Sequence, residues 1–392
     1  MAVKAVRKRP WFTYFPNDYR WSFIVSIAFR RTLLGAADPA EIFEVCGRLQ
    51  KKVGDDRLWT REWKAMGDRV YAMGRAEERA GHKLSASGHY NRATHYLQMA
   101  DRFDFPKTAA SKAYYEKSID SFSRYLKLTD WPRAERVEIP FEGDKSLPAY
   151  FIPAMNTKAA KPPVALSYTG FDGTKETSFL LSGIALAKRG MSVVVPDCPG
   201  VGESIRFRGI HLRHDYEVAA TAIIDWLEKR KDVDAKRVGL LASSLGGYYA
   251  PRSASMEPRI KACVAWGAQW DYYAIWKRRI EAAFKIQLPS PGHHLAWSFG
   301  VKTAQEGLKR LEGFRLDGVV QKMKCPFLIV HGEYDQQIPL SDAKKLFKAA
   351  GSKDKTLRVY KGPDGGAQHC HMDYLSPVIP HMTDWMAEKL GA

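Results

Sequence analysis

A serine at position 244 stands in a pattern typical of a catalytic nucleophile. The run 238–241 is apolar and favours a buried strand, and a helical spacing begins at Gly246. Between them, residues 242–246 read small-x-Ser-x-Gly, in which small residues let the strand and helix backbones pass closely while the serine sits on a sharp turn. We therefore interpret Ser244 as the nucleophile of a nucleophile elbow, with a plain Ser/Gly turn opening a helix as the alternative.

A carboxylate that could support this serine follows later in the chain. A serine hydroxyl is a weak nucleophile, so it needs a histidine to accept its proton and an acid to orient that histidine. The order expected along the chain is serine, acid, histidine. Asp335 follows an apolar run and a turn at Gly332 and precedes a helical segment, so we choose it as the acid. Asp271 and Glu333 are the competing carboxylates.

Two histidines compete for the role of the base. His369 and His371 both lie in the loop between the last apolar strand run and the C-terminal helical segment. We favour His369. With Cys370 between them, the two histidines also resemble a fragment of a metal site, but the sequence offers no second ligand cluster at metal spacing, so we expect no metal.

Acyl transfer also requires N–H donors aimed at the oxyanion that develops on the substrate. The first candidate is the backbone amide of Leu245, directly after the nucleophile. The second is the amide of Phe171, in the loop 169–173 that follows the buried run 163–168. The alternative interpretation of that loop is a simple glycine turn.

The elements that must position these residues follow two patterns. Residues 39–128 carry apolar residues three and four apart, which predicts helices, so we assign residues 1–132 to a helical cap region. Residues 133–392 alternate short β-rich runs with helical stretches, which predicts a mostly parallel sheet covered by helices on both faces. The expected strands are 137–141, 147–152, 163–168, 191–195, 237–241, 262–266, 326–330 and 356–360. The expected helices of this domain are 178–188, 215–229, 246–256, 340–350 and 377–390.

Residues 268–324 interrupt the alternation. They contain no convincing strand but are rich in aromatic residues, of which Trp270, Tyr273 and Trp276 are our candidate pocket residues. Open α/β sheets bind ligands beyond the carboxyl ends of their strands, where an insertion at this point would lie. We therefore expect a lid insertion over 268–324 that, with the N-terminal helices, covers an aromatic pocket. The aromatic residues of the N-terminal helices are interpreted as core.

Composition narrows the functional classes. The chain of 392 residues can bury a large core, and its formal charge of +18 is spread through segments that also carry acids. We therefore expect a small-molecule substrate and neither a nucleic acid nor a membrane as partner. Five cysteines, odd in number and widely spaced, argue against a disulfide framework and favour a reducing, cytoplasmic location. The apolar run 23–29 is too short to span a bilayer.

With these residues in place, the sequence resembles the α/β-hydrolase superfamily. Within it, the sequence is similar to the branch of 2,6-dihydroxypseudooxynicotine hydrolase and the fungal pigment polyketide-shortening hydrolases. The resemblance covers nearly the whole chain and rests on the motifs at 169–176, 197–204, 243–248, 257–259, 265–267 and 367–370. It favours His369 as the base, implies an α/β-hydrolase fold with an N-terminal helical lid and no cofactor, and allows a homodimer.

The resemblance also implies a reaction. Characterised members of this branch hydrolyse a C–C bond next to a carbonyl in a retro-Claisen sense, so we expect a bulky, aromatic or polyketide-like substrate. A carboxylesterase acting on a bulky ester is the first alternative, and a catalytically silent hydrolase fold used as a binding module is the second. Ala242 departs from the first elbow glycine. The nicotine-pathway enzyme is thought to use an extra acid shortly after the Trp-Gly pair, and here Asp271 is the nearest candidate.

Overall fold

The computed structural model describes residues 12–282, 290 and 292–392 and divides into two compact units. The helical unit comprises residues 12–134 together with residues 290 and 292–297, and the sheet unit comprises residues 135–282 and 298–392. Parts of the predicted cap and of the predicted lid insertion, namely residues 1–11, 283–289 and 291, lie outside the described residues. The insertion 268–324 is thereby divided between the two units.

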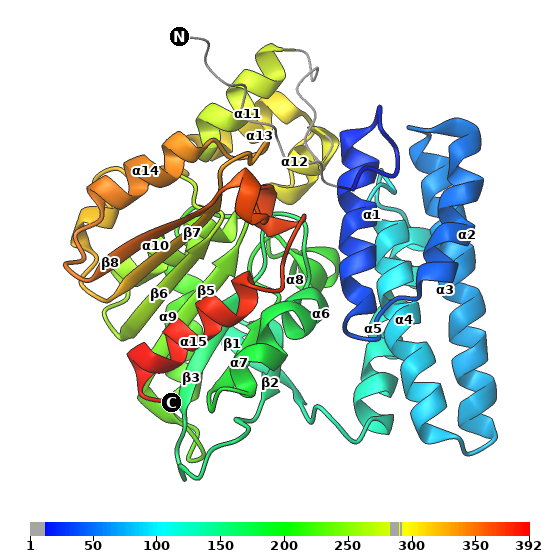
Figure 1. Ribbon diagram of the computed structural model, residues 1–392, viewed down its shortest axis with the longest axis horizontal. Helices are drawn as coiled ribbons and strands as arrows, with labels where there is room; N and C mark the ends of the chain where they lie inside the picture. The colour runs from blue at the N-terminus through cyan, green and yellow to red at the C-terminus, as the bar shows by residue number, and fades with distance from the viewer. Residues whose placement is uncertain (1–11, 283–289, 291) are drawn as a thin grey trace. The chain divides into compact units, whose positions relative to one another are not determined.

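The helical unit confirms the helices predicted for residues 39–128. Its elements are α1 (Tyr19–Thr32), α2 (Pro39–Leu49), the 3₁₀ turn η1 (Gln50–Lys52), α3 (Asp56–Arg79), α4 (Lys83–Asp101) and α5 (Ala109–Leu128). Figure 1 shows α3, α4 and α5 side by side. Trp59 and Trp63 are fully buried and their ring centroids lie 5.7 Å apart, so these aromatic residues form the core of the unit. α12 (Gly292–Ser298) packs against Phe105 through the ring of His293 at 4.3 Å.

The sheet unit confirms the predicted α/β architecture. Its strands are β1 (Glu135–Phe141), β2 (Lys145–Ile152), β3 (Pro163–Tyr168), β4 (Ser192–Pro196), β5 (Asp234–Ser243), β6 (Ile260–Trp266), β7 (Phe327–Gly332) and β8 (Lys355–Tyr360). They form one sheet in the order β1-β2-β4-β3-β5-β6-β7-β8. β1, β2 and β4 pair antiparallel, and every other neighbouring pair is parallel. β3 and β4 are buried along their whole length, as expected of apolar strands covered on both faces.

The helices of the sheet unit lie between and after these strands, and Figure 1 shows α15 in front of the sheet. They are α6 (Lys175–Ser178), α7 (Ile184–Ala187), α8 (Gly202–Arg208), α9 (Glu217–Leu227), α10 (Gly246–Met256), α11 (Tyr272–Glu281), α13 (Ala304–Arg310), α14 (Leu340–Ala349) and α15 (Val378–Leu390). The single helix expected over 178–188 is instead α6, a π-helical turn at Phe179–Gly183 and α7. α8 was not predicted, because its seven residues are too few for a periodic pattern to emerge.

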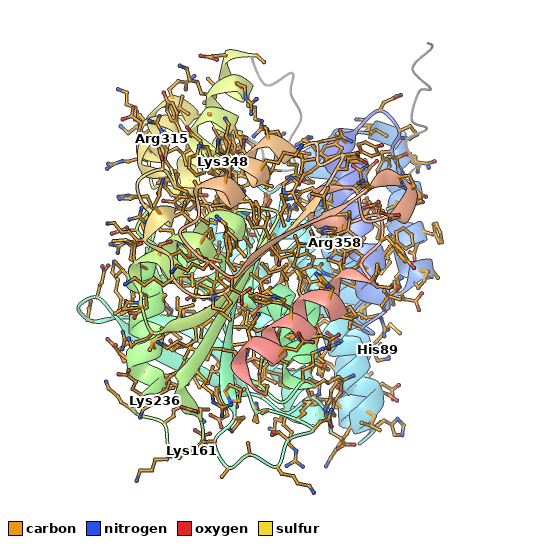
Figure 2. The ribbon with its side chains drawn as sticks, turned by 60° about the vertical axis from the view of Figure 1, so that its left-hand side comes forward. His89, Lys161, Lys236, Arg315, Lys348 and Arg358 are labelled. Atoms are coloured by element: carbon orange, nitrogen blue, oxygen red, sulfur yellow. The ribbon has the colours of Figure 1, made fainter. Side chains whose placement is uncertain are left out.

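Positive charge in the sheet unit is distributed over separate elements. The labelled side chains of Figure 2 include Lys161 before β3, Lys236 in β5, Lys348 in α14 and Arg358 in β8. None of the described helices combines the length and the apolar character that a bilayer crossing needs. All five cysteines are free thiols.

Candidate active site

The backbone around Ser244 has the geometry of a nucleophile elbow. Ser244 lies between β5 and α10 with φ at 61°, a left-handed conformation that costs free energy for a residue with a side chain. A Cβ atom on Gly246 would come within 2.6 Å of the Cβ of Ala242, and one on Gly247 within 2.1 Å of the Gly267 carbonyl oxygen. Both glycines are therefore required by close approach, and the small Ala242 fits the first position of the motif.

The structure brings Ser244, His369 and Asp335 together as one hydrogen-bonded chain. His369 Nε2 lies 2.9 Å from Ser244 Oγ, and His369 Nδ1 lies 2.7 Å from Asp335 Oδ2. The other carboxylate oxygen, Asp335 Oδ1, accepts hydrogen bonds from the backbone amides of Gln337 at 2.8 Å and Ile338 at 2.9 Å. The acid is thus fixed by its own loop, and the imidazole bridges it to the serine.

The competing residues occupy other positions. His371 Nδ1 accepts a hydrogen bond from Trp266 Nε1 at 2.7 Å, which directs that imidazole to the indole. Glu333 Oε2 accepts the backbone amide of Gly362 at 3.0 Å. Asp271 caps α11 by accepting the Ala274 amide at 2.9 Å. The geometry therefore selects Asp335 and His369 as partners of the serine. Among the described residues, no group of three or more His, Cys, Asp or Glu side chains could hold a metal ion.

Burial and neighbouring charge shift the pKa values of His369 and Asp335. Burial favours the neutral form of His369, but the Asp335 carboxylate outweighs burial and raises the pKa of that imidazole well above its ordinary value. Burial likewise favours the neutral form of Asp335, but His369 and the surrounding hydrogen bonds hold the pKa of that carboxyl below its ordinary value. Each group therefore stabilises the charged form of the other.

The loop after β3 passes directly against the serine. A Cβ atom on Gly170 would lie 2.7 Å from Ser244 Cβ and 3.1 Å from Ser244 Oγ, so only glycine fits there. Phe171 follows at once, and Leu245 precedes the first turn of α10. None of the hydrogen bonds seen within residues 12–282, 290 and 292–392 uses the Leu245 amide as a donor. Both residues predicted to supply oxyanion amides therefore lie beside the serine along the chain or across the loop. Leu245 follows Ser244 directly, and Phe171 follows Gly170, which packs against Ser244.

The predicted pocket residues separate into two groups. Trp276 is fully buried, and its ring centroid lies 5.7 Å from that of Phe171. Trp270 and Tyr273 are half-buried. The Trp270 amide donates to Asp342 at 3.3 Å, and the Arg315 guanidinium lies 5.0 Å from the ring centroid of Tyr273. Neither residue shows the ring contact with Phe171 that Trp276 makes. Sequence reasoning missed Tyr272, which is buried and lies 5.9 Å from the Phe171 ring.

A second set of buried charges lies in the motifs at 169–176 and 197–204, whose charged residues had no role in the sequence analysis. We call it the lysine network; its members are Lys175, Glu176, Asp197 and Glu203. Lys175 Nζ lies 2.7 Å from Glu176 Oε1 and 3.1 Å from Asp197 Oδ2, and it also donates to Glu203. The Lys175 backbone amide donates to Asp197 Oδ1 at 2.7 Å. The lysine network therefore ties the end of the loop after β3 to the loop after β4.

This fold and this site define a hydrolase of the α/β-hydrolase class. The chain matches the family described as "Esterase FrsA-like" over residues 52–357 and belongs to that family. It is 27% identical to hydrolase acrC of Aspergillus aculeatus, over 96% of this chain and 98% of that protein. It is 28% identical to 20-hydroxy-prefusarin hydrolase FUS2 of Gibberella moniliformis, over 89% of this chain and 91% of that protein.

Solved structures point to the same fold. The crystal structure of 2,6-dihydroxy-pseudo-oxynicotine hydrolase superposes with a TM-score of 0.75 at 24% sequence identity, covering 92% of this chain and 95% of that one. The family resemblance predicted from the sequence motifs is therefore confirmed.

Proposed function

We propose that this protein is a serine hydrolase in which Ser244 is the nucleophile, His369 the general base and acid, and Asp335 the residue that orients His369. The observation that carries the proposal is the unbroken chain from Ser244 Oγ to His369 at 2.9 Å and from His369 to Asp335 at 2.7 Å. The strained φ of Ser244 and the close approach of Gly170 support it.

The proposed reaction proceeds in two halves. Ser244 Oγ bonds to the substrate carbonyl carbon while its proton passes to His369 Nε2, and the amides of Phe171 and Leu245 donate to the resulting oxyanion. The intermediate collapses as the bond to the leaving group breaks, and His369 returns the proton to that group. Water then gives a proton to His369 and attacks the acyl-enzyme, which releases the acid and restores the Ser244 hydroxyl.

The bond cleaved in the leading proposal is a C–C bond next to a carbonyl, in a bulky aromatic or polyketide-like substrate. In such a β-dicarbonyl substrate the leaving group is an enolate, which takes the proton from His369 and leaves as a ketone. The similarity to a hydrolase named for 20-hydroxy-prefusarin supports this substrate class.

A carboxylesterase is the second candidate. The description of the family as esterase-like favours it, and so does the position of Asp271, which caps α11 and forms an ion pair with Arg315 at 3.5 Å. Because Asp271 already makes these two contacts, it is a poor candidate for the extra acidic residue that the resemblance associates with C–C cleavage. In ester cleavage the leaving group is an alkoxide, which is protonated by His369 and leaves as an alcohol.

Covalent labelling tests the nucleophile. A fluorophosphonate should form an adduct on the peptide containing Ser244, and Ser244→Ala should abolish both labelling and turnover. Ser243→Ala is the matched control, because this neighbour has the same side chain and should keep both. Labelling elsewhere, or turnover by Ser244→Ala, would overturn the proposal. Absence of labelling together with salt-sensitive retention on heparin would instead favour a silent binding module.

A substrate panel separates the two bonds. Turnover of aromatic acyl-ketones supports C–C cleavage, whereas turnover of p-nitrophenyl esters alone supports the carboxylesterase. Asp271→Asn sharpens the result, because asparagine caps a helix as well as aspartate does but supplies no acid. Selective loss of acyl-ketone cleavage in this variant would assign the extra acid to Asp271, and unchanged cleavage would exclude it.

A further inference from the structure

Trp266 occupies the point where the strands that carry the catalytic residues meet. It is the last residue of β6 and pairs with Ser243 of β5 on one side and with Val330 of β7 on the other. Its side chain is fully buried. Its carbonyl oxygen accepts the backbone amide of Ser244 at 2.8 Å, so the backbone of Trp266 holds the elbow directly.

The side chain of Trp266 reaches the other half of the site. Its indole Nε1 donates to His371 Nδ1 at 2.7 Å, two residues after the catalytic base. The Tyr360 ring lies 4.8 Å from the His371 ring. Because Nδ1 accepts this hydrogen bond, His371 must be neutral and carry its proton on Nε2.

The segment held by this hydrogen bond is strained. Cys370 has φ at 48° and His371 has φ at 57°, and each left-handed residue with a side chain costs on the order of 1–2 kcal/mol. Such a backbone persists only where surrounding contacts determine it. The contacts seen here are the indole hydrogen bond, the Tyr360 ring, and Cys370 Sγ, which lies 3.8 Å from the Trp266 carbonyl oxygen and 3.6 Å from His369 Nε2.

The glycine after Trp266 provides a left-handed turn beside the histidine loop. Gly267 has φ at 83°, and a Cβ atom there would lie 3.4 Å from Cys370 Sγ and 3.7 Å from His369 Cε1. The Gly267 amide donates to the Val330 carbonyl at 2.9 Å, which keeps this turn joined to β7. The Trp-Gly motif at 266–267 therefore contacts the elbow, the histidine loop and the strand that leads to the acid.

We infer that Trp266 is a positioning residue that sets the distance between nucleophile and base, with its carbonyl fixed to Ser244 and its indole N–H fixed to the loop of His369. The inference rests on the proposed serine mechanism. It assigns the indole hydrogen bond to His371 a role in catalysis that simple core packing would not require.

Trp266→Phe removes the indole N–H and keeps an aromatic ring. We expect kcat and the rate of fluorophosphonate labelling to fall by about 10- to 100-fold, because small displacements of reacting groups have effects of this size. KM should change by less than about threefold, since the interaction serves the transition state rather than substrate binding. Trp226→Phe in α9 is the matched control, because Trp226 packs against Phe151 away from the site, and it should keep wild-type kinetics.

A set of His371 variants separates positioning from folding. Asn offers an acceptor oxygen near the position of Nδ1 and tolerates a left-handed backbone, whereas Leu offers no acceptor. His371→Asn should therefore retain kcat and His371→Leu should lose it about as far as Trp266→Phe does. In the Trp266→Phe background the difference between Asn and Leu should shrink, because the donor is gone and only their different tolerance of the left-handed backbone is left.

The outcomes are distinct. If the difference between Asn and Leu is undiminished without the indole, or if Trp266→Phe keeps wild-type kcat and labelling while folded, the inference is wrong. If Ser244→Ala retains turnover, the serine mechanism itself fails, whatever Trp266→Phe does. Circular dichroism and thermal unfolding of every variant show whether a kinetic loss comes from a folded protein.

Discussion

The sheet unit buries two charged networks whose construction differs. One is the proposed catalytic network of Ser244, His369 and Asp335, and the other is the lysine network around Lys175. Asp335 and Lys175 are both almost fully excluded from solvent, at 1% and 0% side-chain exposure. Burial of an ion is costly unless it is paired, so both networks need internal partners. They differ in whether a proton moves between their members, as we propose for Ser244 and His369.

In the lysine network the positive charge of the ammonium is fixed. Burial favours the neutral form of Lys175, but the carboxylates of Asp197, Glu176 and Glu203 outweigh it and raise the pKa of the ammonium well above its ordinary value. The left-handed residues in the loop between Asp197 and Glu203 are the glycines Gly200 and Gly202, which adopt this conformation without side-chain strain. The catalytic network instead includes the strained Ser244 and adjoins the strained Cys370 and His371.

One loop joins the two networks. Gly170 packs against Ser244 at one end, and five residues later Lys175 is held by Asp197 through both its amide and its ammonium. The lysine network thus anchors the segment that carries the amide of Phe171, which we propose as an oxyanion donor. Similar burial therefore gives rigidity around Lys175 and, in the proposed mechanism, supports proton transfer around His369. Substitutions in the two networks should fail in different ways.

Asp335→Asn should have the largest effect. Loss of the carboxylate removes the charge that stabilises protonated His369, so we expect kcat to fall by about 10⁴-fold, the size seen when the acid of such a triad becomes an amide. The retained side-chain oxygen can still accept the amides of Gln337 and Ile338, so the fold should persist. Steady-state kinetics and circular dichroism measure the two quantities.

Glu333→Gln is the control for this change, because Glu333 lies on the same loop and its carboxylate accepts the Gly362 amide without contacting His369. It should keep kcat within about twofold, since an amide oxygen accepts the same hydrogen bond. A fall of less than tenfold for Asp335→Asn, or an equal fall for both variants, would remove Asp335 from the proposed mechanism.

Lys175→Met should act on stability. Without Lys175, the cation that the structure shows beside the carboxylates of the lysine network is Arg136. Its Nη2 lies 2.7 Å from Glu203. Removing one partner of a buried ion pair costs about 3–5 kcal/mol, so the free energy of unfolding in urea should fall by that amount. Lys161→Met, at an exposed position, should leave stability unchanged within about 0.5 kcal/mol. A kcat loss as deep as that of Asp335→Asn at unchanged stability would contradict the comparison.

The two networks also differ in how far the sequence could predict them. The strands of the parallel sheet were recognisable as apolar runs, and the residues directly after β5 and β7 had to lie at the same sheet edge. Ser244, Asp335 and His369 follow from that logic and from the chemistry of each residue type. The lysine network could not be predicted in this way. Lys175 and Asp197 come together because β3 and β4 are neighbours in the sheet, and the sequence does not reveal that strand order. Their motifs were visible, but nothing in the residue types showed that they pair.

Helical faces and long-range contacts were harder to predict. The aromatic residues around α11 were evident, but the sequence pattern could not show that Tyr272 and Trp276, rather than Tyr273, contact Phe171. The hydrogen bond between Trp266 and His371 joins residues 105 positions apart and depends on a left-handed backbone at Cys370 and His371, which is uncommon for residues with a side chain. Such contacts form only when the elements of the folded sheet unit pack together, so local sequence patterns do not reveal them.

The smallest predicted effect is a pH dependence that separates activity from stability. The base acts when His369 is neutral, so kcat/KM should rise by about tenfold per pH unit up to the raised pKa of His369, above the ordinary value of 6.5. A histidine whose pKa is higher in the folded than in the unfolded state adds stability that is complete below about pH 6.5 and is lost as pH rises through the folded value. Activity should therefore increase in the same pH window in which the free energy of unfolding decreases.

Asp335→Asn tests this opposition, because it removes the main cause that raises the pKa of His369. Relative to this variant, the wild type should lose at most about 1.4 kcal/mol of unfolding free energy per pH unit in the window above pH 6.5, as required when one proton is released. The residual activity of the variant should rise at a lower pH than that of the wild type. Lys175→Met should leave the activity profile in place, because the lysine network takes no part in the proposed proton transfer. If both variants moved the activity profile equally, the proton would not belong to His369, and the distinction between a fixed and a mobile charge network would fail.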